Sequence, residues 1–256
     1  MPSYPLDALP FWTVLVATAV VAWVAVELGY RGGRNRRKHD PGERGEPVLS
    51  IQGSILALLA FLLAITFGMA VDRYAARKAA VVTEANAIGT CFLRADLLRE
   101  PIASEVRDLL REYADTRIAG AQPGTLQAAI LRSEELHQAL WERAVRSVDA
   151  EPGALGPALF TQSLNELIDL HQVRIVAGLY NRIPIGIWVA LYSVSILAML
   201  SVGYGLGLSG SSRSMTTVAL AVAFSIVIAL VVDLDRPQAG MLTISQRAMT
   251  DVRESM

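Results

Sequence analysis

Four long apolar runs dominate the pattern of hydrophobic and polar positions along the chain. They cover residues 11–28, 51–71, 183–208 and 215–232, and Glu27 is the one charged residue within them. A helix rises about 1.5 Å per residue, so each run can cross a hydrocarbon layer of about 30 Å. The pattern therefore predicts four transmembrane helices, two before a long polar segment and two after it.

The segment between the second and third runs is polar, but it keeps a helical period and shows no alternation typical of strands. Breakers divide it into four predicted helices: the second run continued to about Arg99, then residues 104–119, 125–148 and 158–180. The last of these is expected to lead directly into the third apolar run. The helix at 125–148 carries its apolar and aromatic positions on one stripe: Leu126, Ile130, His137, Leu140, Trp141, Val145 and Val148.

These patterns predict an all-α integral membrane protein with a helical bundle inserted between transmembrane helices 2 and 3. Transmembrane helices 1 and 2 occupy residues 1–72, and the helical extramembrane domain, continuous with helix 2, occupies residues 73–182. Transmembrane helices 3 and 4 occupy residues 183–232, and residues 233–256 form a C-terminal tail.

Composition agrees with membrane insertion, since 53% of the residues are hydrophobic and 18% are charged. The lipid bilayer is therefore the first expected partner. A net charge of −1 argues against nucleic acid as a second partner. Lys38 and Lys78 are the only lysines among many arginines, which suggests a bacterial source. Cys91 is the single cysteine, so no disulfide framework is expected.

A cleaved signal peptide is the competing interpretation of the first run. Such a peptide begins with basic residues, whereas residues 1–10 contain Asp7 and no Lys or Arg. Basic residues follow the run instead: Arg31, Arg34, Arg36, Arg37, Lys38 and Arg44. This favours an uncleaved anchor in the plasma (inner) membrane, with the N-terminus and the helical domain on the outer face. Arg213 supports this orientation, and Arg73 argues for the opposite one.

The second run presents two distinct faces. Small residues recur on one of them: Gly53, Ala57, Ala60, Ala64 and Gly68. Small side chains let helices approach closely in lipid, so this face predicts helix packing, either within one subunit or between subunits. The other face carries Leu58, Phe61 and Ile65, followed by Asp72. In a symmetric oligomer it would form an apolar pore constriction with an acidic ring, and in a monomer a lipid-facing stripe.

Charged and polar residues beyond the spans suggest ion pairs. Glu84, Asn86, Arg94 and Asp96 lie in an apolar frame, and Glu84 is expected to find its partner on another helix. Asp233, Asp235 and Arg236 follow the fourth span directly. These acids are candidates for pairing with Arg73, Arg94 or Arg182, and their cluster is the second candidate for an ion site.

An enzyme is not expected. The three histidines, His39, His137 and His171, show no metal-ligand spacing with acids or with Cys91, so we expect neither a metal nor a cofactor. Gly203, Gly205, Gly207 and Gly210 end a transmembrane helix with no strand before it. That context excludes a phosphate-binding loop.

Two motifs resemble a known family. They are Glu84-Ala85-Asn86-Ala87-Ile88-Gly89-Thr90 with Leu93-Arg94-Ala95-Asp96, and Leu234-Asp235-Arg236-Pro237 with Gly240. Both are similar to signatures of the bacterial bestrophin-like membrane protein family, and the similarity covers nearly the whole chain. Bestrophins are pentameric anion channels whose second helix lines the pore. The resemblance implies that Phe61 and Ile65 stand at the constricting neck.

The chain also departs from bestrophins, because the neck proline and the acidic calcium-binding cluster are absent. The orientation favoured by charge is opposite to theirs as well. Two hypotheses from different classes follow. The first is a homo-oligomeric ion channel, pentameric or tetrameric, with the second helix around a pore for a permeant ion. The second is a non-conducting sensor or scaffold whose helical domain binds a partner.

Overall fold

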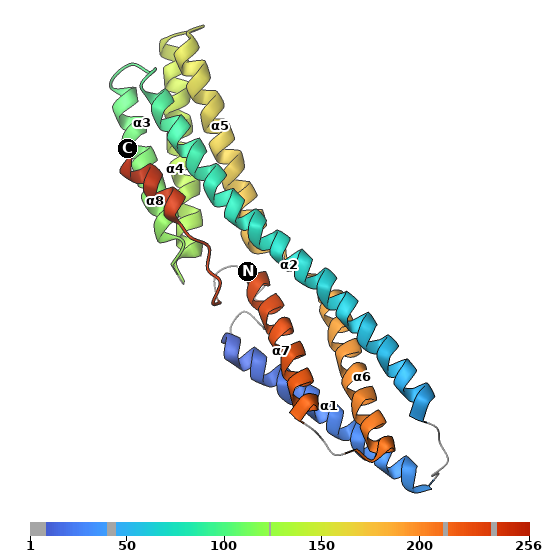
Figure 1. Ribbon diagram of the computed structural model, residues 1–256. Coiled ribbons are helices and arrows are strands. Elements are labelled where there is room, and N and C mark those ends of the chain that lie inside the picture. Colours follow the sequence, from blue (N-terminus) through green and yellow to red (C-terminus); the bar gives the residue numbers. More distant parts are fainter. Residues whose placement is uncertain (1–8, 40–44, 123, 212–214, 237–239) are drawn as a thin grey trace. The chain divides into compact units, whose positions relative to one another are not determined.

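The computed structural model describes residues 9–39, 45–122, 124–211, 215–236 and 240–256. Asp7, Arg44, Arg213 and Pro237, which the predictions used, lie outside these ranges. Helices account for 86% of the described residues, which contain no strand, and this confirms the all-α prediction. The elements are α1 Phe11–His39, α2 Gly45–Ala95, α3 Ile102–Ala119, α4 Leu126–Ala150, α5 Leu155–Ile175, the π-helical turn η1 Val176–Tyr180, α6 Ile185–Ser209, α7 Met215–Asp235 and α8 Arg247–Glu254 (Figure 1).

Four helical segments are long and apolar enough to cross a membrane, as predicted. They are Phe11–His39, Val48–Ala95, Leu155–Ser209, which includes α6, and Met215–Asp235. The protein is therefore a multi-pass membrane protein. The chain divides into two compact units, one formed by residues 1–73 and 182–242 and the other by residues 74–181 and 243–256. We call these the membrane unit and the bundle unit, and α2 contributes to both.

Glycines hold the membrane unit together where α1 crosses α6. A Cβ atom added at Gly29 would overlap the carbonyl oxygen of Leu200, and one added at Gly203 would overlap the carbonyl oxygen of Val26. Gly33 and Gly207 meet the facing backbone in the same way. Each helix thus contributes two glycines four residues apart, the spacing that lets helix backbones touch in lipid. The role of Gly203 and Gly207 in this contact was not predicted from the sequence, which only excluded a phosphate-binding loop at these glycines.

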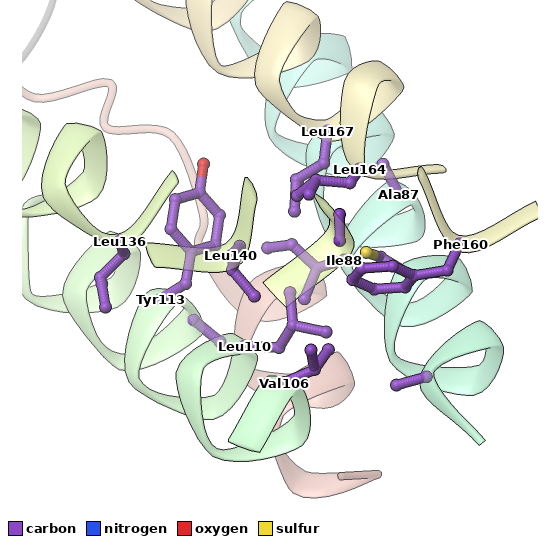
Figure 2. Packing of buried hydrophobic residues seen from close by; sticks show 14 of the residues in the cluster. Ala87, Ile88, Val106, Leu110, Tyr113, Leu136, Leu140, Phe160, Leu164 and Leu167 are labelled. Carbon is purple, nitrogen blue, oxygen red and sulfur yellow. The ribbon is translucent and has the colours of Figure 1, made fainter. Parts of the chain in front are cut away.

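The bundle unit has a side-chain core. Figure 2 shows Ile88 of α2, Leu110 of α3, Leu140 of α4 and Leu164 of α5 converging from four helices, and each is buried. The C-terminal helix α8 joins this core through Met249, which is fully buried. The segment predicted as a separate tail is thus shared between the units, because residues 243–256 group with the bundle.

The last bundle helix does not lead directly into the third span, so that expectation is wrong. α5 ends at Ile175, η1 follows to Tyr180, and the chain is non-helical from Asn181 to Pro184. Proline lacks an N–H and disfavours helical geometry at the residue before it, here Ile183. The freed backbone N–H of Ile183 donates a hydrogen bond to Asp235 Oδ1 at 3.0 Å.

Two other details differ from the sequence predictions. α2 ends at Ala95, and a turn replaces its expected last residues up to Arg99. On α4 the predicted stripe splits, because His137 and Leu140 are buried while Trp141 and Val145 are exposed. The buried face of α4 continues through Ala144 and Ser147 instead. With 3.6 residues per turn, Trp141 lies about 100° around the helix from Leu140, which carries it out of the core.

Candidate functional site

The face of α2 predicted to line a pore is exposed in the single chain. Leu58 is 50% exposed, Phe61 62% and Ile65 47%, and Asp72 is exposed as well. The opposite face is buried at Leu59, Leu63, Thr66 and Ala70. The candidate pore side chains therefore share an open apolar surface of the membrane unit.

The small residues of the second span also lie on this open side. Gly53, Ala57, Ala60, Ala64 and Gly68 are all exposed. A Cβ atom added at Gly53 or Gly68 would meet no atom within 4 Å. Among the described residues of the single chain, the small face of α2 is therefore open. Lipid or a second polypeptide remains to cover it.

A buried polar network, which we call the Glu84 network, occupies the centre of the bundle unit. Glu84 of α2 is fully buried and accepts hydrogen bonds from Arg117 Nε of α3 at 2.9 Å and from Arg174 Nη1 of α5 at 2.5 Å. The Tyr113 hydroxyl donates to the same carboxylate at 2.7 Å. Arg174 also donates to Gln246 Oε1 at 2.8 Å, which ties the C-terminal segment to the network. A single carboxylate thus links α2, α3 and α5.

Electrostatics keep Glu84 ionised. Burial acts to raise the pKa of this carboxyl, but the guanidinium groups of Arg117 and Arg174 outweigh it and hold the pKa below its ordinary value. Burial also raises the pKa of Tyr113 well above its usual range, and the negative charge of Glu84 adds to that effect. The carboxylate and its two cations therefore persist as a paired, desolvated cluster.

Two neutral histidines border the Glu84 network. Burial lowers the pKa of His137 to about 4 and that of His171 to about 3, and the Arg117 charge adds to both shifts. Their rings contact edge to face, with centroids 4.8 Å apart, and His171 Nδ1 lies 3.3 Å from the Tyr113 hydroxyl. The Nε2 atoms of both rings are buried and have no hydrogen-bond partner among the described residues. Protonation of either ring would place a cation beside Arg117.

The other motif residues lie apart from this network. Arg94 donates to the backbone carbonyl of Leu159 at 2.9 Å. Asp96 accepts from Arg107 Nη1 at 2.5 Å near the surface, and Asn86 is exposed on the outer face of α2. The motif around Glu84 therefore combines one core charge, two stabilising contacts at the end of α2 and one exposed amide.

The acids after the fourth span organise the end of α7. Asp235 accepts from Arg182 Nε at 3.0 Å, and both side chains are buried. Asp233 accepts the backbone N–H groups of Met241 and Leu242 at 3.0–3.1 Å. Gly240, with φ +149°, lies so close that a Cβ there would come within 2.5 Å of the Asp233 carboxylate. Arg236 is buried beside them. The hydrogen bonds of Asp233 therefore tie residues 241–242 to the end of α7.

The histidines, the acids and Cys91 do not form a common cluster among the described residues. No group of three or more His, Cys, Asp or Glu side chains able to hold a metal ion occurs in the described part of the chain. Burial raises the pKa of the Cys91 thiol to about 12, so the thiol stays protonated and unreactive.

Sequence reasoning missed Tyr113, Arg117 and Arg174, and it considered His171 only as a possible metal ligand. Two features of the sequence point to these residues. Tyr113 and Arg117 are four residues apart and share the apolar face of α3, and His171 and Arg174 are three apart on α5. Charged residues on an apolar face require a buried counter-charge, and Glu84 provides it.

The chain matches one known protein family. The model of the Bestrophin-like domain family matches residues 16–249, from the first span to α8. No curated protein and no solved structure matches the chain. The match begins within the first span, includes the other three spans and ends within α8, and it contains both sequence motifs that resemble the family. The chain therefore belongs to the Bestrophin-like domain family.

Proposed function

We propose that the protein is a homo-oligomeric ion channel of the bacterial plasma membrane, with the α2 helices of a pentamer or tetramer around the pore. The observation that carries this proposal is the exposure of Phe61, Ile65 and the small-residue face on the same side of α2. Membership of the Bestrophin-like family gives independent support. We also propose that the protein acts without catalysis, metal or cofactor.

The arrangement of α2 side chains suits a helix that faces a central axis. At about 100° per residue, Phe61 lies roughly 200° around α2 from the buried Leu59. The small residues lie on one flank of Phe61, where a neighbouring subunit would approach it. Phe61 and Ile65 would then narrow the pore, and Asp72 would add a ring of negative charge at its end.

Conductance across a planar bilayer tests the proposal. The purified protein should carry ionic current, and the double variant Phe61→Ala/Ile65→Ala should carry more, because it removes the apolar constriction. A matched control is Val16→Ala on α1, which is also exposed but belongs to another helix, and it should leave the current unchanged. Absence of current in the wild-type protein and in the double variant, across pH and calcium concentration, would refute the channel.

Orientation is part of the proposal, with the N-terminus and the bundle unit on the outer face. A cysteine at Gly32 reports it, because Gly32 is exposed and an added Cβ there meets only the Tyr204 ring, at 3.8 Å. In a Cys91→Ala background, Gly32→Cys in whole cells should resist a membrane-impermeant thiol reagent. Rapid labelling would reverse the topology. Gly33 is unsuitable, because a side chain there would overlap the α6 backbone.

One observation favours the alternative of a non-conducting scaffold. Trp141, Val145 and Val148 of α4 are 40%, 46% and 41% exposed and lie on one side of that helix. Exposed apolar side chains at helical spacing are typical of a surface that binds a partner protein. A protein without current that retains one specific partner through these three residues would support the scaffold over the channel.

A further inference from the structure

A pocket of about 340 Å³ lies at one end of the membrane unit. Its walls come from the start of α2, the end of α6 and the start of α7, at the end of the unit where α1 also finishes (Figure 1). This volume falls in the range that is typical of ligand-binding pockets. All the lining residues belong to one chain, so a single subunit forms the pocket.

The walls of the pocket are mainly apolar. Their aliphatic side chains include Leu49 of α2, Val202 and Leu206 of α6 and Leu220 of α7. Buried water needs several polar partners, so walls of this kind favour an apolar occupant over water alone. At the edge of a bilayer, the acyl chain of a lipid is such an occupant.

One polar atom on the wall lacks a partner. Gln52 Oε1 is buried and has no hydrogen-bond partner among the described residues. A Cβ atom added at Gly205 would come within 2.7 Å of this oxygen, which therefore lies against α6. Buried amide groups normally form hydrogen bonds with protein, water or a ligand. The occupant is therefore expected to carry a polar group at the level of Gln52.

Positive charge is concentrated at this end of the membrane unit. The Arg37 guanidinium lies so close to Gly210 that a Cβ atom there would overlap it, and Gly210 directly follows Ser209 of the pocket wall. Along the sequence, residues 31–48 and 209–216 together hold seven basic residues and three acids. Basic pockets between transmembrane helices bind the head groups of anionic lipids. The charge therefore favours a negatively charged occupant.

Polarity changes in one direction along the pocket. Arg37 and Ser209 lie at the end of α6, and the Gln52 amide lies beside Gly205, about one helical turn before that end. The wall deeper in the span is aliphatic. A glycerophospholipid has its groups in the same order, with the phosphate first, then the ester carbonyls and then the acyl chains. The amide can turn its NH₂ group toward an ester carbonyl, because its carbon bears both a donor and an acceptor.

We infer that the pocket binds one anionic glycerophospholipid of the bilayer, such as phosphatidylglycerol. Its phosphate pairs with Arg37, an ester carbonyl accepts from Gln52, and an acyl chain lies along the aliphatic wall. Guanidinium and phosphate form charge-assisted hydrogen bonds, and the surrounding excess of basic residues selects a lipid with net negative charge. Phosphatidylcholine has the same esters and chains without that charge, so it binds more weakly.

Photolabelling of the wild-type, full-length protein tests the site. The probe is phosphatidylglycerol with a diazirine on one acyl chain, diluted into phosphatidylcholine liposomes. It should label residues 202–209 and 216–220 in a saturable way, and excess unlabelled phosphatidylglycerol should suppress that labelling. Labelling of Val16 and Val20, which are exposed on α1, is the control and should not saturate. Excess phosphatidylcholine and free glycerol phosphate should leave the pocket labelled.

Three results of this experiment would overturn the inference. The first is labelling that is equally weak and unsaturable in the pocket and on α1. The second is equal suppression by phosphatidylcholine, which would remove the selection for negative charge. The third is suppression by free glycerol phosphate, which would assign the pocket to a soluble anion. None of these measurements depends on ionic current, so they stand apart from the channel proposal.

Variants separate the contribution of the head group from that of the chain. In a native mass spectrometry titration, Arg37→Gln should bind phosphatidylglycerol about tenfold more weakly, because a hydrogen bond between charged groups is lost. Arg31→Gln is the matched control, since Arg31 is on the same helix but pairs with Glu27 at 2.7 Å, and it should keep the affinity. Leu206→Trp fills the pocket and should abolish binding. Leu197→Trp, at an exposed position of α6, should retain it.

Unchanged binding in Arg37→Gln or in Leu206→Trp would overturn the inference. Equal losses in Arg37→Gln and Arg31→Gln would do so as well, because they would show attraction by overall charge without a defined site. Circular dichroism checks the helicity of each variant. The photolabelling decides the question with the wild-type chain if Leu206→Trp does not fold.

Discussion

The membrane unit and the bundle unit are stabilised in different ways. In the membrane unit, Gly29 and Gly203 bring the backbones of α1 and α6 into contact. In the bundle unit, large side chains such as Phe160 and Leu110 fill the core, and the Glu84 network pairs the buried charges. Lipid offers no hydrophobic drive between helices, so close packing replaces it, whereas water drives apolar side chains together. Each unit should therefore be destabilised by a different kind of substitution.

Removing the shared carboxylate should have the largest effect. Glu84→Ala leaves Arg117 and Arg174 buried without their counter-charge, which typically costs about 3–5 kcal/mol. Hydrogen–deuterium exchange should show α3, α4 and α5 losing protection while α1 and α6 keep theirs. Glu135→Ala, at an exposed ion pair with Arg132, is the matched control and should cost under about 1 kcal/mol. Equal loss of protection in both variants would show that the network does not stabilise the bundle.

Acid should destabilise the bundle unit selectively. The pKa of His137 falls to about 4 and that of His171 to about 3 in the folded protein, against an ordinary value of 6.5. The contribution of the two neutral histidines to the free energy of unfolding is complete above pH 6.5. It is lost as pH falls, because the unfolded chain then binds protons that the folded chain does not. At one pH unit below 6.5, the two rings together lower the free energy of unfolding by roughly 2–3 kcal/mol.

Urea unfolding of the bundle unit, followed by hydrogen–deuterium exchange of its helices, should show this pH dependence. His137→Leu should reduce the slope between pH 6.5 and 4, since it removes one of the two proton-binding groups. An unchanged slope would mean that His137 does not titrate in the way described. The lowered pKa of Glu84 adds a further loss below pH 4.5, with the same sign.

Filling the α1–α6 contact should have a smaller effect, confined to the membrane unit. Gly203→Val places a side chain against the Val26 carbonyl and forces the helices apart, at about 1–3 kcal/mol. Exchange protection should fall in α1 and α6 and persist in α3–α5. Gly186→Ala is a suitable control, because an added Cβ there meets no atom within 4 Å. Full protection of α1 and α6 in Gly203→Val would contradict the close-contact account.

The sequence predicted those structural features that depend on a single helix. The four spans follow from unbroken apolar runs, and the passage of α2 out of its span follows from the absence of a breaker after Val71. The break before α6 was also readable, because Pro184 restricts Ile183, but the helical period on either side concealed it. The open face of α2 was visible as a pattern, and its exposure required the structure.

The Glu84 network was harder to foresee because it depends on several helices at once. Arg117 and Arg174 lie 33 and 90 residues from Glu84 in the chain. Many arginines stand at similar helical positions, and only packing decides which of them reach the carboxylate. The α1–α6 contact depends in the same way on which face of each helix meets the other. Its two glycine pairs, at a spacing of four, were nevertheless present in the sequence.

The central claim is that α2 surrounds the axis of a symmetric oligomer. Electron microscopy of the purified assembly in a lipid nanodisc measures this directly. The account predicts four or five subunits with α2 as the innermost helix and Phe61 or Ile65 at the narrowest point. A monomer, or an assembly with α2 at the lipid-facing rim, would contradict it.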